Sequence, residues 1–102
     1  MNQFIESKRS EIDQLCARHH VRRLEVFGSF TGEGFNPETS DLDFLVEFHD
    51  LPEGHYADAY LGLLEALEQL FSRPVDLLIT SAIKNPYLVE SIQQSRVVLY
   101  AA

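Results

Sequence analysis

The chain has 102 residues, of which 45% are hydrophobic and 24% are charged, and its formal net charge is −8. This length fits one domain with a modest core, and the composition is that of a globular protein rather than a disordered one. The acidic balance argues against a general nucleic-acid-binding protein, because such proteins present a basic face to the phosphates, so no direct contact with nucleic acid is expected.

The pattern of hydrophobic residues predicts an α/β (α+β) fold, a sheet covered by helices. The expected elements are a helix over residues 3–19, strands over 21–27 and 41–48, a helix over 56–71, a strand over 74–79, a helix over 86–94 and a strand over 96–100. Between the first two strands, the stretch "TGEGFNPETS" has the glycines and the Asn-Pro pair of a turn. Asn85 is expected to cap the last helix, with Pro86 in its first turn.

The helix over residues 56–71 is apolar over an unusually wide arc. One stripe comprises Ala57, Tyr60, Leu61, Leu64, Leu67 and Phe71, and a second comprises Tyr56, Tyr60, Leu63, Leu67 and Leu70. Such a helix either lies deep in the core or contacts a partner protein. The sequence leaves both possibilities open.

A single cysteine, Cys16, excludes an internal disulfide and fits a reducing compartment. Its position beside Ile12 and Leu15 indicates a small core side chain rather than a nucleophile. The sequence shows neither a secretory signal nor an apolar run long enough to cross a membrane. A soluble, cytoplasmic protein without membrane contact is therefore expected.

Three aspartates interrupt the apolar strands. Asp41 and Asp43 are two residues apart at the start of a strand, so they face the same side of the sheet. Asp76 interrupts the run "VDLLI" of another strand. If these two strands pair, the three carboxylates converge at one end of the sheet.

Three converging carboxylates repel one another unless a cation lies among them, and oxygen ligands of this kind suit Mg²⁺. Two such ions could clamp an in-line phosphoryl displacement. The alternative is structural: Asp41 caps a turn, Asp43 is solvated at an edge strand, and Asp76 has no part in a site.

Gly28 and Ser29 close the strand that precedes the acids. A glycine allows the backbone to approach a ligand closely, and Ser29 with the amides that follow can open a short helical turn. Such a turn offers N–H groups and a hydroxyl to a phosphate.

The combination of "GS", "DLD" on the next strand and "VDLL" resembles the DNA-polymerase-β-like nucleotidyltransferase superfamily. The short length and the phrases "NPETSDLDFLVEF", "RPVDLLI" and "NPYLVESI" are more similar to the minimal nucleotidyltransferases that act as antitoxins in prokaryotic toxin–antitoxin pairs. The resemblance covers residues 22–100. It implies that residues 1–102 form one minimal nucleotidyltransferase domain, with an N-terminal helix over 3–19 and a catalytic core over 22–100.

The resemblance implies a mixed sheet of about four strands with helices on one side. It also implies Mg²⁺, ATP as substrate, and transfer of AMP to a hydroxyl, typically of a tyrosine in a HEPN-type toxin. Carried over by position, Gly28 and Ser29 would bind the nucleotide phosphates. Asp41 and Asp43 would ligate metal, and Asp76 would complete the metal site and help to deprotonate the acceptor.

One stretch departs from the family pattern, since relatives often carry a basic residue between the Gly-Ser pair and the acids. Here residues 30–40 contain none. The triphosphate charge is then expected to fall to metal ions, backbone amides or a distant cation such as Arg73 or Lys84.

Two alternatives to protein nucleotidylation follow from the same residues. The fold could neutralise a toxin by steric binding alone, although a purely steric inhibitor has no physical need for three mutually repelling acids. Transfer to a small molecule would need a second pocket, for which about 100 residues leave little room.

Overall fold

The structure, a computed structural model, describes residues 3–28, 42–80 and 83–102. Its helices are α1 (Gln3–Glu6), α2 (Arg9–Arg18), α3 (Tyr56–Phe71) and α4 (Pro86–Ser95). Its strands are β1 (Val21–Phe27), β2 (Asp43–Phe48), β3 (Asp76–Ile79) and β4 (Val97–Ala101). The predicted element order is confirmed, while β2 and β3 each begin two residues later than predicted.

The helix predicted over residues 3–19 is wrong in one respect, because it is broken between α1 and α2. The Ser7 hydroxyl donates a hydrogen bond to the Phe4 carbonyl, and the Lys8 amide bonds the Ile5 carbonyl in a tighter, three-residue turn. Serine side chains compete with the helical backbone in this way. The chain therefore bends before α2 begins.

The four strands form one mixed sheet in the order β3-β2-β1-β4. The pair β2–β3 is parallel, and β1 is antiparallel to both β2 and β4. Parallel neighbours need a crossover connection, which α3 supplies here. As a result, β2 and β3 both begin at the same end of the sheet.

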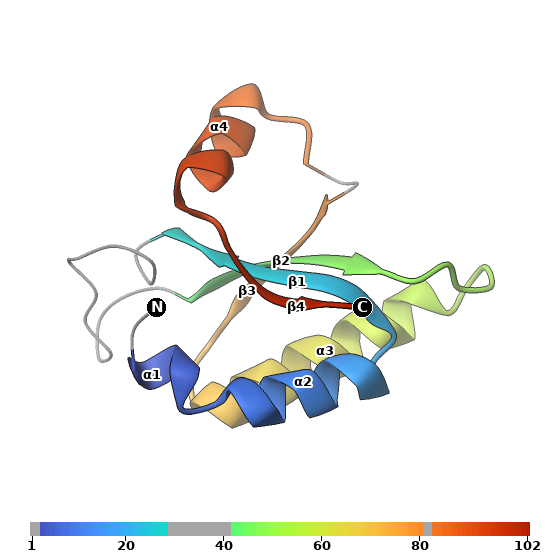
Figure 1. The fold of residues 1–102 in the computed structure, drawn as a ribbon. Helices are drawn as coiled ribbons and strands as arrows, with labels where there is room; N and C mark the ends of the chain where they lie inside the picture. Colours follow the sequence, from blue (N-terminus) through green and yellow to red (C-terminus); the bar gives the residue numbers. More distant parts are fainter. Residues whose placement is uncertain (1–2, 29–41, 81–82) are drawn as a thin grey trace.

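The main core lies between the sheet and helices α1, α2 and α3, which cover one face (Figure 1). Alternate residues of β2 point into it, as predicted, namely Phe44, Val46 and Phe48, and Leu42 just before the strand does the same. Cys16 is fully buried in this core, so its interpretation as a small core side chain is confirmed. This layer gives β2 a rigid, apolar support on its inner face.

The fourth helix, α4, lies on the opposite face of the sheet (Figure 1). Ile92 of α4 packs there against Phe27 and Leu45 in a second, smaller cluster. The expectation of helices on one side only is therefore wrong. The physical reason is that Phe27 and Leu45 project from the outer face and need an apolar cover.

Helix α3 buries one stripe of its wide apolar surface, formed by Ala59, Leu63, Leu67 and Phe71. Leu61, in contrast, is 59% exposed, so the helix does not lie deep in the core on all sides. Contact with a partner stays a prediction for this face. None of the helices in the described part of the chain combines the length and apolar character needed to cross a bilayer.

Candidate active site

Asp43 and Asp76 are register partners at the start of the parallel strands β2 and β3. The Asp76 amide donates a hydrogen bond to the Leu42 carbonyl at 3.0 Å, which fixes β3 beside the start of β2. Register partners on neighbouring strands are about 4.8 Å apart and project to the same face. The strand pairing on which the predicted convergence of these two carboxylates depends is thus confirmed, and Asp76 is exposed to an incoming molecule.

Two other residues proposed from the sequence, Ser29 and Asp41, lie outside the described residues. Within the described ranges, no third carboxylate, histidine or cysteine joins Asp43 and Asp76 in a group able to hold a metal ion. The roles of Ser29 and Asp41 therefore stay predictions.

Gly28 lies next to Asp43, because Phe27 is the register partner of Asp43 in the antiparallel pair β1–β2. Its φ of +78° is in the region that L residues with side chains rarely adopt. A Cβ atom at this position would also lie only 2.8 Å from Asp43 Oδ2. Glycine is therefore required twice, once by the backbone and once by the carboxylate packed against it.

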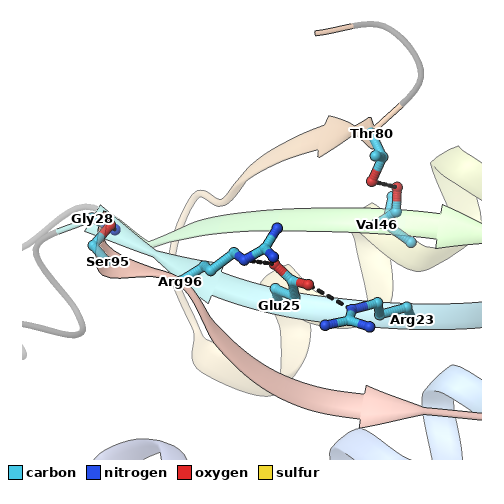
Figure 2. Close-up of polar contacts among 7 residues, drawn as sticks. All are labelled: Arg23, Glu25, Gly28, Val46, Thr80, Ser95 and Arg96. Atoms are coloured by element: carbon cyan, nitrogen blue, oxygen red, sulfur yellow. Dashed lines mark hydrogen bonds and ion pairs between the residues drawn. The ribbon is translucent and has the colours of Figure 1, made fainter. Parts of the chain in front are cut away.

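The end of α4 contacts the same glycine. The Gly28 amide donates a hydrogen bond to Ser95 Oγ at 3.0 Å (Figure 2). Ser95 is the last residue of α4, so a helix on the outer face is attached to the end of β1 beside the carboxylates. Ser95 was not predicted as a site residue, because nothing in the local sequence pattern singles it out.

A buried carboxylate, Glu25, lies on the same outer face of β1, and its side chain is only 4% exposed. Arg23 Nε lies 2.6 Å from one of its oxygens and Arg96 Nε lies 3.7 Å from the other. The two arginines approach Glu25 from opposite sides (Figure 2). Arg96 follows Ser95 directly, so the exit of α4 is tied to β1 at two successive residues.

The cations named for the triphosphate lie at different places. Arg73 precedes the start of β3, the end that carries Asp76, and its guanidinium lies 5.1 Å from the centroid of the Phe4 ring. Lys84 follows the other end of β3 and is exposed. Of the two, only Arg73 lies near the start of β3, where Asp76 is.

The donor set at the start of β2 and β3 fits a hard divalent cation. Asp43 and Asp76 are side by side in the backbone register of β2 and β3, and both provide carboxylate oxygens, the ligands that Mg²⁺ prefers. Like charges in this position repel one another, and a cation between them would remove that repulsion.

Comparison with known protein families places this geometry in context. The model of the nucleotidyltransferase domain family matches residues 9–99 of the chain. A candidate protein adenylyltransferase of Methanocaldococcus jannaschii is 33% identical over 93 residues, which cover 83% of this chain and 91% of the relative. The protein adenylyltransferase MntA of Thermococcus cleftensis is 38% identical over 72 residues, covering 71% of this chain and 69% of the relative.

Solved structures share the fold. A candidate minimal nucleotidyltransferase is 34% identical and superposes with a TM-score of 0.71, covering 91% of this chain and 90% of its own. A second structure is the complex of a tri-AMPylated HEPN toxin of Shewanella oneidensis with its MNT antitoxin. It has a TM-score of 0.64 at 17% identity and covers 96% of this chain and 73% of its own, a likeness of fold alone.

Proposed function

This chain belongs to the nucleotidyltransferase domain family, and on that premise we propose that it transfers AMP from ATP to a tyrosine hydroxyl of a HEPN-type toxin, as the antitoxin of the pair. The observation that carries the proposal is the pairing of Asp43 with Asp76 beside Gly28. The relatives named as protein adenylyltransferases support the same choice of reaction.

In this proposal two Mg²⁺ ions would be bound. Their ligands would be Asp43 and Asp76, together with Asp41 of the adjoining segment. When bound, such ions neutralise triphosphate charge and favour the departure of pyrophosphate. Gly28 lets the chain pass close to Asp43, and Ser29 would contact the phosphates that arrive there. The chain's own part in the rate is therefore positioning and charge balance.

In the transfer itself, the acceptor oxygen attacks the α-phosphorus of ATP. A new oxygen–phosphorus bond forms as the bond from the α-phosphorus to the bridging oxygen breaks, and pyrophosphate leaves. Asp76 accepts the proton of the hydroxyl, as a general base must lie within reach of the proton that it removes. Its exposure suits this role, because the acceptor approaches from outside the molecule.

A partner protein is a better acceptor than a small molecule for this chain. Asp76 lies on β3, an edge strand of only four residues, and is exposed. A second protein can bring its tyrosine to this open edge and exclude water from it.

The proposal is tested by intact-mass analysis of a HEPN partner after incubation with this protein, ATP and Mg²⁺. We expect a mass gain in whole AMP units, lost with Asp43→Asn. Asp50→Asn removes an exposed acid beyond the far end of β2 and is the matched control. We expect this variant to retain AMP transfer. If no mass is gained and the wild type and Asp43→Asn both bind and silence the toxin, inhibition is steric and the proposed transfer is wrong.

A further inference from the structure

The contact between Ser95, at the end of α4, and Gly28 has a role in the site that the position of Ser95 in the sequence does not reveal. We propose that Ser95 is a positioning residue of the nucleotide site: its hydroxyl oxygen holds the Gly28 backbone against which the Asp43 carboxylate is packed. This inference rests on the proposed function for its catalytic meaning. The placement of the Asp43 carboxylate by Ser95 and Gly28 follows from the geometry alone.

Gly28 is contacted on two sides, by Ser95 and by Asp43. Its amide donates to Ser95 Oγ at 3.0 Å, while its Cα is so close to Asp43 that an added Cβ would lie 2.8 Å from Oδ2. Ser95 and Asp43 thus contact the same residue. A shift of the Gly28 backbone would change the space available to the carboxylate.

The helix that carries Ser95 is held against the sheet. Ile92 packs α4 onto Phe27 and Leu45 of the sheet. Asn85 caps the start of the helix by accepting the Tyr87 amide at 2.9 Å. The first turn of α4 is therefore capped, and its C-terminal half is packed on the sheet.

An ion pair lies beside the contact between Ser95 and Gly28. Arg96, directly after Ser95, pairs with buried Glu25, which Arg23 also holds (Figure 2). Glu25 lies three residues before Gly28 on β1. This ion pair, at 3.7 Å, links the exit of α4 to β1 close to the point where Ser95 accepts the Gly28 amide.

The test compares Ser95→Ala with the wild type by two readouts that need no transfer activity. The first is hydrogen exchange of the Gly28 amide, and the second is the affinity for Mn²⁺, which prefers the same carboxylate ligands as Mg²⁺. We expect exchange to be about five- to tenfold faster, as befits the loss of one hydrogen bond. We expect Mn²⁺ affinity to fall about tenfold, as for other residues that orient a ligand.

Two variants separate positioning from a general loss of structure. Ser95→Thr keeps the hydroxyl and should restore both readouts. Gln94→Ala, an exposed neighbour on α4, should leave both unchanged. Alanine favours the helix more than serine does, so Ser95→Ala does not weaken α4 itself.

The outcomes are distinct. If Ser95→Ala matches Gln94→Ala in either readout, the proposal is overturned. If both readouts change and Ser95→Thr restores them, it is supported, and kcat/KM for AMP transfer should then fall at least about tenfold. If the wild type binds Mn²⁺ but transfers no AMP, the proposed function fails while the two readouts still decide the role of Ser95.

Discussion

Gly28 and Asp43 are in contact across the antiparallel strands β1 and β2, with the carboxylate occupying the space where a side chain at residue 28 would begin. A Gly28→Ala variant must rotate the Asp43 carboxylate away and adopt a φ of +78°. We expect a stability loss of only about 1 kcal/mol from the backbone but a loss of AMP transfer of about 100-fold or more. Urea unfolding and transfer kinetics, measured together, check this split.

The chain offers a matched control for that variant. Gly54 also has a positive φ, of +88°, but an added Cβ there would meet nothing within 4 Å. Gly54→Ala should therefore cost a similar amount of stability and leave transfer unchanged. Equal transfer rates in the two variants would show that the contact with Asp43 has no importance for activity.

Asp76→Asn should raise stability slightly in the absence of metal, because it removes one of two adjacent like charges. With Mg²⁺ tenfold above its Kd, the wild type should gain about 1.4 kcal/mol and the variant clearly less. Thermal unfolding with and without MgCl₂ measures both effects. An equal response of wild type and variant to Mg²⁺ would exclude Asp76 as a ligand.

Glu25 and Glu47 allow a comparison of a buried and an exposed ion pair. The Glu25 side chain is 4% exposed and pairs with two arginines, whereas Glu47 is 42% exposed and pairs with Arg22 at 3.2 Å. Glu25→Ala should cost about 2 kcal/mol, less than for a fully buried pair because both arginines stay partly hydrated. Glu47→Ala should cost below about 1 kcal/mol. Chemical denaturation of both variants measures the two losses of unfolding free energy. Equal losses would show that burial of the ion pair has no importance here.

The raised pKa of the buried Cys16 thiol should make the stability of the protein depend on pH. Burial, with a smaller contribution from Asp13, raises the pKa of its thiol from 9.0 to about 12. Below pH 9 the thiol is protonated in both states, whereas between pH 9 and 12 it ionises only after unfolding. Ionisation therefore favours the unfolded chain, and stability should fall by about 1 kcal/mol more in the wild type than in Cys16→Ala between pH 8 and 10.

The accessibility of the thiol provides an independent check of that prediction. At pH 8 the native protein should react with a thiol reagent only as fast as it unfolds. A rapid reaction of the folded protein would show that Cys16 is accessible, and the expected pH dependence would then be lost.

The sequence predicted the elements best where their limits have local causes. The limits of β1 and α3 agree with the structure, since Gly28 follows one and a long apolar period defines the other. Two-residue periodicity placed Asp43 on one face of its strand, and the parallel pairing then brought Asp76 to it. The break at Ser7 was missed because one side-chain hydrogen bond decides it.

The rest of the site was not predictable because it depends on contacts distant in sequence. Ser95 reads as an ordinary helical serine until the fold places it at the Gly28 amide. Glu25 is different, because it interrupts an apolar strand in the same way as Asp76 does. That irregularity could have identified it as a buried acid in need of arginine partners.

The hydrogen bond between Gly28 and Ser95 joins residues 67 positions apart. During synthesis the strands that carry Gly28, Asp43 and Asp76 leave the ribosome before Ser95 does, and contacts of such long range form late. Asp43 and Asp76 are closer together in sequence, so β2 and β3 can pair before the Gly28 backbone acquires its helical anchor. Order of folding would thus make the docking of α4 at the end of β1 a late requirement for the site, so that Asp43 reaches its final surroundings only once this contact has formed.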